Sequence, residues 1–530
     1  MTSTARTDVA SNENGGPSRT SARHRPTQPR RRPPRNARGV AASFLGLAAL
    51  LAAAPAAAHW TPTTFQVGGY LSLAPHGGVR DVRRLLLANG AGLDWIIAQD
   101  QRNVRGVRGY DVAGFRTLLD SLRQAPDFHL RAILRDEPLG ALDAPHLFEY
   151  AHDVPARTWV AERLSPANGL DPGPSALGWD VWDEPLDGPT MRRAVATARE
   201  LDAQPSAAGG LAFTNLCGIE AFSGANNPRA SAFGVNAAGD PERAYRAYLD
   251  AFLAPFDSTA APAPLVSFDE YPFQYERGDL RGWFGALRIV REAAAAHGRG
   301  GQAVPFWTIV QLSPYASGQP PCGELNSADT TYRADFGFAE TRWQVWTAVA
   351  YGAKGIGYWL LGEGRNRCEI WGPGLWSGAD ADTSAASGRY SQVRALDAEL
   401  HTLGPVLMKC DPVGVVHADS LGWPFLTPEL ASNPSRASRM VAGFGVADSE
   451  AMAGELRDRA SGARYVLVVN KSRTGPRTFT VRFAEAPTAV WRVNRASGHE
   501  SPAAISGSSL RVVDLPPGTG ELYRVVLPAQ

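Results

Sequence analysis

Two adjacent carboxyl groups, Asp183 and Glu184, follow an apolar stretch within Ala176–Pro185, which reads Ala-Leu-Gly-Trp-Asp-Val-Trp-Asp-Glu-Pro. The stretch is typical of a buried strand, and Pro185 ends it because proline has no N–H to give to a strand ladder. A carboxyl at such a strand end, close to tryptophans, is partly desolvated, so its pKa rises and it can act as a general acid. On this segment alone, the alternative is that Asp183 caps the next helix and Glu184 is a surface charge.

Strand-like and helix-like segments alternate between Phe65 and Leu361 and would position these carboxyls. The eight predicted strands are Phe65–Tyr70, Leu93–Gln99, Phe128–Leu134, Ala176–Glu184, Leu211–Leu216, Pro264–Phe268, Val304–Val310 and Gly355–Leu360. The predicted helices are Val79–Leu87, Val112–Arg123, Met191–Leu201, Glu242–Leu253, Leu280–Ala296 and Thr341–Tyr351. Repeated strand–helix units of this number predict an α/β fold, a closed (β/α)₈ barrel. An open doubly wound sheet is the alternative, but no Gly-x-Gly-x-x-Gly follows the first strand.

Polar and aromatic residues stand at nearly every predicted strand end, which is where such a barrel carries its site. They are Tyr70, Gln99, Arg135 with Asp136, Asp183 with Glu184, Asn215, Asp269 with Glu270 and Tyr271, Gln311, and Trp359 with Glu363. This mixture lacks a metal-ligand cluster and a Gly-rich phosphate cradle, so we expect no metal and no cofactor. It suits a sugar ring, whose hydroxyls need hydrogen-bonding groups and whose CH faces need aromatic rings.

Tryptophans are concentrated in the last part of the predicted barrel. Trp343 and Trp346, three residues apart on a helix, are expected to pack that helix against the barrel. Trp359 at a strand end is the preferred sugar platform, ahead of Trp371 and Trp376 in a Gly-rich loop.

Short β-branched and aromatic segments follow a last long helix, Ser387–Leu403, and predict a small antiparallel β-sandwich. They are Gly414–Ala418, Arg439–Val446, Arg464–Asn470, Thr478–Phe483, Ala489–Val493, Leu510–Asp514 and Glu521–Leu527. The predicted organisation is a leader over residues 1–58, a barrel over 59–408 and the sandwich over 409–530.

The N-terminal region carries several arginines before the apolar run Val40–Ala54, which is followed by Ala56-Ala57-Ala58. This order predicts a signal peptide cleaved after Ala58, hence a secreted, cell-surface or periplasmic protein without a membrane span. The leader holds nine arginines and two acids, so its removal from 53 basic and 52 acidic residues leaves 44 against 50, a net charge of −6. A mildly acidic protein has no basic stripe for nucleic acid.

Four cysteines are present, and their spacing matches no zinc-binding pattern. Export would allow disulfides, and Cys322 and Cys368 both fall in long loops on the same face of the predicted barrel, so they are the candidate pair. Free buried thiols are the alternative.

Three motifs in order along the predicted barrel resemble clan A glycoside hydrolases, and most closely the barrels similar to family 42 β-galactosidases. They are Trp-Asp-Glu-Pro at 182–185, Phe-Asp-Glu-Tyr-Pro at 268–272, and the stretch from Glu340 to Trp359. The resemblance covers about Phe65–Leu361 and implies that Glu184 is the acid/base. In that clan the preceding residue is usually an asparagine that touches the sugar 2-hydroxyl, whereas this chain has Asp183.

A second departure concerns the nucleophile, which in that clan is a glutamate ending the seventh strand. Here that strand ends on Gln311, and an amide cannot form a glycosyl ester. The candidates for the second carboxylate are, in order, Asp269, Glu340, Glu270 and Glu363. The alternative role of Asp269 is a structural hydrogen bond, and that of Glu340 is a charge at a helix N-terminus, favoured by the helix dipole.

The leading hypothesis is a glycoside hydrolase acting on a carbohydrate substrate, with Glu184 as acid and Asp269 or Glu340 as the second carboxylate. Tyr271 would position that carboxylate, Asn215 and Gln311 would hold hydroxyls, and Trp359 would floor the subsite. The rival is a catalytically silent carbohydrate-binding barrel, which Gln311 favours. A metal-dependent hydrolase is a distant third because no ligand cluster is present. Nothing in the sequence indicates the sugar, endo or exo action, retention or inversion, or the oligomeric state.

Overall fold

The computed structural model describes sixteen segments of the chain. They are residues 60–70, 82–99, 112–124, 127–135, 155–165, 173–204, 210–223, 227–235, 240–259, 263–273, 280–315, 336–365, 370–378, 384–418, 440–445 and 450–528. The predicted leader, Asp136, both candidate disulfide cysteines and most of the loops 138–174 and 312–338 lie outside these residues.

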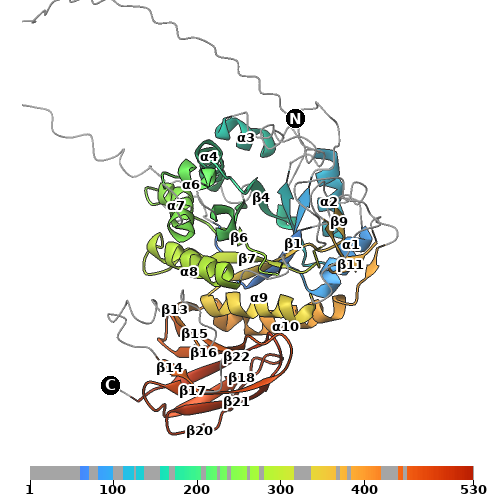
Figure 1. Ribbon diagram of the computed structural model, residues 1–530. Helices are drawn as coiled ribbons and strands as arrows, with labels where there is room; N and C mark the ends of the chain where they lie inside the picture. The colour runs from blue at the N-terminus through green and yellow to red at the C-terminus, as the bar shows by residue number, and fades with distance from the viewer. Residues whose placement is uncertain are drawn as a thin grey trace, which may run out of the picture. The chain divides into compact units, whose positions relative to one another are not determined.

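Eight parallel strands close into a barrel in sequence order, β1 pairing with both β2 and β8. The strands are β1 (Gln66–Tyr70), β2 (Trp95–Gln99), β3 (Arg131–Arg135), β4 (Ala176–Asp183), β5 (Leu211–Leu216), β6 (Val266–Asp269), β7 (Phe306–Gln311) and β8 (Gly355–Trp359). Helices surround them, as Figure 1 shows. This closed barrel confirms the predicted fold class of the first part of the chain.

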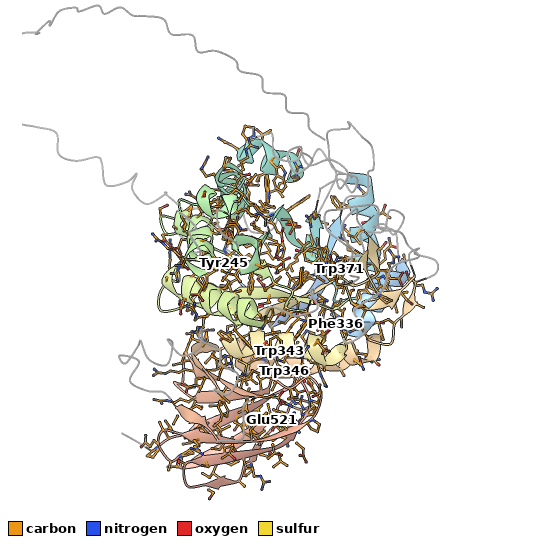
Figure 2. All side chains as sticks on the ribbon, in the orientation of Figure 1. Tyr245, Phe336, Trp343, Trp346, Trp371 and Glu521 are labelled. Atoms are coloured by element: carbon orange, nitrogen blue, oxygen red, sulfur yellow. The ribbon has the colours of Figure 1, made fainter. Side chains whose placement is uncertain are left out.

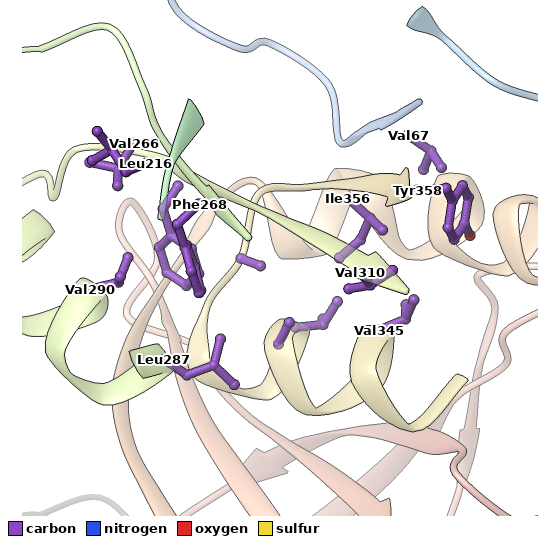
Figure 3. Close-up of a cluster of buried hydrophobic side chains, with 14 of the residues drawn as sticks. Val67, Leu216, Val266, Phe268, Leu287, Val290, Val310, Val345, Ile356 and Tyr358 are labelled. Carbon is purple, nitrogen blue, oxygen red and sulfur yellow. The ribbon is translucent and has the colours of Figure 1, made fainter. Parts of the chain in front are cut away.

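The surrounding helices include each predicted one and two that the sequence analysis missed, α3 and α6. They are α1 (Val82–Ala91), α2 (Val112–Gln124), α3 (Ala156–Arg163), α4 (Gly188–Asp202), α6 (Pro228–Ala232), α7 (Pro241–Leu253), α8 (Leu280–Ala296), α9 (Phe338–Tyr351) and α10 (Tyr390–Leu407). Apolar side chains of strands and helices fill the layer between them, part of which is drawn in Figure 3. Among the residues that the structure describes, no helix is long and apolar enough to cross a membrane.

Large side chains fill the inside of the barrel. Trp95 of β2 and Trp307 of β7 stack with ring centroids 5.2 Å apart and an interplanar angle of 11°. Gly68 of β1 and Gly357 of β8 make room for them, because a β-carbon at either position would overlap the Trp95 ring. The barrel floor is therefore packed, and open space for a ligand has to lie at the strand ends.

The C-terminal part consists of two antiparallel sheets, which confirms the predicted sandwich class. Six strands are ordered β13 (Cys410–His417), β15 (Ala451–Asp458), β16 (Arg464–Asn470), β22 (Gly520–Val526), β18 (Ala489–Val493), β19 (Glu500–Pro502). Four are ordered β14 (Val441–Phe444), β17 (Arg477–Phe483), β21 (Ser509–Leu515), β20 (Ile505–Ser506).

Helix α9 joins barrel and sandwich through a shared apolar core. A β-carbon at Gly454 of β15 would overlap the Ala350 carbonyl of α9, so only glycine allows this approach. Trp346 of α9 packs on Gly520 of β22, whereas Trp343 packs on Phe273 with centroids 5.3 Å apart. Figure 2 labels both tryptophans on this helix. The prediction that these rings pack α9 against the barrel therefore holds for Trp343, while Trp346 contacts the sandwich.

Candidate active site

Polar side chains from the ends of β3, β4, β5 and β6 meet around one amide, that of Asn215. Its Nδ2 atom lies 3.2 Å from Oδ1 of Asp183 and 3.2 Å from Oδ1 of Asp269. Its Oδ1 atom accepts a hydrogen bond from the Ser267 hydroxyl at 3.2 Å. All the hydrogens of this amide are thus used within the protein, and Asn215 is only 2% exposed. The geometry gives Asn215 the task of positioning two carboxylates, rather than the predicted task of holding a sugar hydroxyl.

Strand β4 is irregular, and this irregularity orients its carboxylates. The register shifts once against β3, between Ala132 and Ile133, and once against β5, between Asp180 and Trp182. Such bulges break the strict alternation of side chains and re-aim the residues that follow. Both Asp180 and Asp183 consequently contact the barrel-end arginine, Arg135.

Arg135, at the end of β3, is the cation of this cluster. Its Nη2 atom lies 2.9 Å from Oδ2 of Asp183, and its Nε atom lies 3.5 Å from Oδ2 of Asp180. The Arg135 side chain is 7% exposed and that of Asp180 only 1%, whereas Asp183 keeps 25% of its side chain exposed. Asp183 is therefore held in place by a buried cation and still has a face open to a ligand.

Glu184 directly follows β4 with a left-handed backbone, φ 49°, which is uncommon for a residue with a side chain. Its backbone N–H donates to the carbonyl of Asn215 at 2.8 Å, which ties the turn to β5. The residue is half-buried. Burial raises the pKa of Glu184 well above its usual value, and the nearby Asp269 and Asp183 carboxylates raise it further, against a smaller opposing effect of Arg229.

Burial is the predicted cause of this shift, but Trp179 does not provide it. Trp179 is turned away from Glu184 and packs between Phe115 and Trp159 of the surrounding helices. The next helix is capped by Asp187, whose side chain accepts from the Thr190 N–H at 2.7 Å, so Asp183 is not its cap.

Asp269 ends β6 and is also half-buried. Burial and the charge of Asp183 raise its pKa from 3.8 to about 7, although hydrogen bonds from Tyr271 and Asn215 work in the opposite direction. The tyrosine contact is the positioning role predicted for Tyr271. Around neutral pH, Asp269 is thus a mixture of carboxyl and carboxylate.

Glu340 does not join this cluster. Its carboxylate accepts from the Gly337 N–H at 2.8 Å in a capping box at the start of α9. It also lies 3.6 Å from Nη1 of Arg473, which belongs to the sandwich. These contacts favour the alternative that the sequence analysis gave for Glu340, a charge at the helix N-terminus.

Two further predicted substrate contacts are sealed inside the protein. Gln311 is 0% exposed, and its Nε2 atom donates to the carbonyl of Ser313 at 3.2 Å. Glu270 is 1% exposed and packs against Gly218, which follows β5. Successive side chains of a strand point to opposite faces, so Glu270 points away from the face that carries Asp269. Neither can reach a sugar, because neither presents a surface at the strand ends.

Aromatic rings line the same end of the barrel. Trp359, which ends β8, lies with its ring centroid 5.2 Å from that of Tyr70, 6.0 Å from Trp371 and 6.4 Å from Tyr271. Trp359 and Tyr271 are half-buried, so part of each ring remains accessible. Trp371, labelled in Figure 2, is 2% exposed and supports the other two rings. Trp359 thus lies at the strand ends with part of its ring open, and its role as a sugar platform stays a prediction.

Some predicted residues and some that prediction missed complete the picture. Of Gln99, only the backbone in β2 is described, and it pairs with Arg135. Asp180, Glu220 and Arg229 act electrostatically on the cluster and were not singled out from the sequence. Strict alternation along β4 would place Asp180 and Asp183 on opposite faces, so no sequence signal pointed to their shared contact with Arg135. Cys217 and Cys410 are free buried thiols, as the alternative for the cysteines stated. In the described part of the chain, no three His, Cys, Asp or Glu side chains are grouped so that they could hold a metal ion.

The arrangement can deliver a proton and stabilise a cation. Because the pKa of Glu184 is raised, this residue keeps its proton to higher pH than an ordinary glutamate, and Asp183 lies beside it in an ion pair with Arg135. The half-buried Tyr271 lies close enough to Glu184, and the buried Tyr70 close enough to Asp183, to interact with them electrostatically. These are the elements required for acid-catalysed cleavage of a bond that leaves a positively charged carbon.

Comparisons with known proteins add only weak similarities. No protein-family profile matches the chain, and no curated protein matches it. A family 39 glycoside hydrolase from the gut symbiont Bacteroides cellulosilyticus WH2 is 12% identical, with 87% of this chain and 81% of that chain covered, at a TM-score of 0.44. A β-galactosidase from Bacillus circulans sp. alkalophilus is 10% identical over 87% of this chain and 99% of its own, at 0.48. A family 42 β-galactosidase from G. stearothermophilus is 10% identical over 88% and 99%, at 0.44. At this level the similarities assign no activity, and the functional assignment has to come from the side chains of the site.

Proposed function

We propose that this protein is a glycoside hydrolase that cleaves an oligo- or polysaccharide, with Glu184 as the general acid. The observation that carries the proposal is the state of Glu184 at the strand ends, half-buried and with its pKa raised by burial and by two neighbouring carboxylates. An accessible carboxyl whose pKa is raised keeps its proton to higher pH, and it can protonate the leaving oxygen of a glycosidic bond.

Asp269 is the second carboxyl group of the proposed pair. It is the strongest charged influence on Glu184, and it is accessible, unlike Glu340 and Glu270. Its negative charge discourages ionisation of Glu184, so it helps to keep the acid protonated. Tyr271 holds it by a hydrogen bond.

The substrate class follows from the surroundings of the acid. Half-buried Trp359 and Tyr271 offer ring faces for the CH groups of a sugar. Asp183 and Asp269 offer acceptor oxygens for sugar hydroxyls. The two carboxyl groups lie close together, because the Oδ1 atom of each is 3.2 Å from the same Asn215 nitrogen. A neutral carbohydrate satisfies both kinds of contact.

The rival proposal is a carbohydrate-binding barrel without catalysis. The specific observation in its favour is Gln311, an amide at the end of β7 where the resemblance implies a catalytic glutamate. The accessible Glu184 favours the hydrolase, because a binding site has no need for a carboxyl with a raised pKa.

Export is part of the proposal and is supported by the leader sequence alone. The basic region, the apolar run Val40–Ala54 and the small residues before His59 have the order of a cleaved signal. Expression of the full chain in a secreting bacterial host, followed by N-terminal sequencing of the exported protein, tests this. A mature chain beginning at His59 is expected, and retention of the uncleaved chain in the cytoplasm contradicts it.

The decisive experiment compares the wild type with Glu184→Gln on a panel of plant and microbial polysaccharides and aryl glycosides. Loss of the acid is expected to reduce kcat/KM by roughly 10²–10⁴-fold on substrates with a poor leaving group. Glu340→Gln is the matched control, because it removes a carboxylate that caps α9 and pairs with Arg473 of the sandwich, and it should keep full activity. Unchanged activity in Glu184→Gln refutes the acid assignment. Glycan binding without hydrolysis by the wild type supports the rival.

A further inference from the structure

The group that attacks the anomeric carbon is not supplied by β7. Gln311 is an amide with 0% exposure, and its backbone carbonyl accepts from Thr341 Oγ1 at 3.1 Å and Gln344 Nε2 at 3.3 Å. These contacts fix the strand end within the protein. Of the carboxylates that prediction offered instead, Glu340 caps α9 and Glu270 is buried. Glu363 accepts a hydrogen bond from the Gly378 N–H at 3.3 Å.

Asp269 is accessible, but it is poorly suited to attack carbon. With a pKa raised to about 7, it is largely a neutral carboxyl at mildly acidic pH, and a protonated carboxyl is not a nucleophile. It also accepts hydrogen bonds from Asn215 and Tyr271, which hold its carboxyl group in one orientation.

Asp183 is the carboxylate that is ion-paired with Arg135 at the strand ends. Arg135 holds its Oδ2 atom at 2.9 Å and Asn215 holds its Oδ1 atom at 3.2 Å. A carboxylate has about four acceptor positions, so these two contacts leave room for an N–H or O–H donor from a ligand. Because 25% of the side chain is exposed, such a donor can reach it.

A buried hydroxyl, that of Tyr70, lies near this carboxylate. Tyr70 is only 2% exposed, and its hydroxyl has no hydrogen-bond partner among the described residues. Burial raises the pKa of Tyr70 and the nearby Asp183 and Asp180 raise it further, so the hydroxyl stays a donor. A buried donor without a partner is costly, and a ligand acceptor at this point would satisfy it.

We propose that the substrate is an N-acylated amino sugar, a 2-acetamido-2-deoxyhexoside, whose own acyl oxygen attacks the anomeric carbon while Asp183 accepts the amide N–H. The proposal rests on the hydrolase function with Glu184 as acid and adds the substrate class and the nucleophile. Position 183 carries an aspartate where the resemblance implies an asparagine. The aspartate carboxylate accepts a hydrogen bond from the N–H of a substrate amide more strongly than an asparagine side chain would. An intramolecular nucleophile of this kind needs no carboxylate from β7.

The reaction balances in two steps. In the first, the acyl oxygen forms a bond to the anomeric carbon as the bond to the leaving oxygen breaks, and Glu184 gives its proton to that oxygen. The cyclic oxazolinium ion carries a positive charge, which the Asp183 carboxylate offsets through the amide N–H. In the second step, water gives a proton to the Glu184 carboxylate and its oxygen bonds to the anomeric carbon. The ring bond to the acyl oxygen then breaks, its electron pair restores the amide, and the product keeps its anomeric configuration.

The aromatic rings fit the remaining part of such a substrate. An acetyl methyl group is apolar and requires an apolar surface beside the sugar. Trp359, Tyr271 and Trp371 form a connected group of rings, with Tyr271 and Trp371 centroids 5.7 Å apart. This group borders Asp269 through the Tyr271 hydrogen bond.

The first test measures hydrolysis of 4-methylumbelliferyl β-glycosides of N-acetylglucosamine and N-acetylgalactosamine beside those of glucose and galactose. The N-acetyl substrates are expected to react with kcat/KM at least about 10²-fold higher, with retained configuration by NMR. Mono-, di- and trifluoroacetyl analogues of the preferred substrate should show kcat falling with each fluorine, because fluorine withdraws electrons from the attacking oxygen.

The second test separates a role of Asp183 in this attack from a structural role. Asp183→Asn is expected to lower kcat by about 10²-fold with little change in KM, and Asp183→Glu should recover part of the loss. Asp187→Asn is the matched control, because it removes a nearby carboxylate while keeping a side chain that caps α4. Thermal unfolding of each variant shows whether the fold is kept.

The outcomes distinguish the two levels of the proposal. Three results overturn the acyl-assisted reaction and leave the hydrolase function intact. They are a faster reaction of the glucose and galactose glycosides, products of inverted configuration, and rates unaffected by fluorination. Equal kcat in Asp183→Asn and the wild type overturns the role of Asp183. No hydrolysis of any glycoside overturns the hydrolase function itself.

Discussion

The guanidinium of Arg135 lies 2.9 Å from the carboxylate of Asp183, and the arginine is almost fully buried while the aspartate is partly open. The pair joins the ends of β3 and β4. The same arginine also contacts the buried Asp180 at 3.5 Å, so one cation balances two acids. It therefore keeps a negative group in the cleft that would otherwise be costly to bury.

Replacement of Arg135 by Gln should damage both folding and activity. The change leaves Asp180 and Asp183 without their cation, and breaking a buried ion pair costs about 3–5 kcal/mol. Arg135→Lys keeps the charge but loses the forked geometry, so we expect a smaller fall in Tm and a clear loss of kcat. Differential scanning calorimetry and initial rates measure the two effects. An Arg135→Gln protein as stable and active as the wild type would contradict this role.

The pH dependence of kcat/KM should report the proton on Glu184. Because its pKa is raised, the protonated acid persists to higher pH than in an ordinary glutamate, and activity should fall only as pH rises through that raised value. Asp269→Asn removes the largest neighbouring charge that opposes ionisation, so the alkaline limb should move to lower pH. Rates from pH 4 to 9 on one substrate measure this shift. An alkaline limb that stays in place, or moves up, would argue against the electrostatic link between the two residues.

Asp397 should make the fold less stable as pH rises. This α10 residue is fully buried, accepts from the Tyr358 hydroxyl at 2.6 Å, and has a pKa raised from 3.8 to about 8, mainly by burial. A raised folded pKa means that its contribution is fully present below about pH 4 and is lost as pH rises to about 8. The Tm of Asp397→Asn minus that of the wild type should therefore be larger at pH 8 than at pH 5.

A surface aspartate of opposite sign is the control for this measurement. Backbone N–H groups of Ser461 and Ala460 lower the pKa of the half-buried Asp458, so its contribution is lost as pH falls. Asp458→Asn should lower Tm at neutral pH and lose this effect in acid. The same pH trend in both variants would show that the change does not come from the Asp397 carboxyl.

Loss of the Trp359 ring should weaken substrate binding more than it slows chemistry. Trp359→Ala removes the accessible platform, and we expect KM to rise by about 10-fold, since ring stacking on a ligand contributes on the order of 1 kcal/mol. Trp359→Phe keeps an aromatic face beside Tyr70 and should lie between the two. Kinetics on an oligosaccharide and an aryl glycoside measure this, and an unchanged KM in the alanine variant would exclude the platform role.

Local patterns were sufficient for the barrel and for much of its site. Buried parallel strands are apolar runs that differ visibly from the helices between them, so all eight were found in order, and Asp183, Glu184 and Asp269 follow from where those runs end. Strand β15 was missed because Ala451–Asp458 is rich in small residues, and its place between β13 and β16 depends on the packing of Gly454 against α9.

The tertiary structure decided which polar residues can act. Sequence treats Asp269, Glu270, Glu340 and Gln311 alike as polar groups near strand ends, but exposure and contacts depend on side-chain direction and on neighbours distant in the chain. The register shifts in β4 bring both Asp180 and Asp183 to Arg135, and Arg473 of the sandwich lies beside Glu340. The amide of Asn215 joins Asp183 and Asp269 across three strands, and no local pattern records that contact. The sequence by itself therefore determined the elements and the chemistry available at their ends, whereas long-range packing determined which of those groups meet.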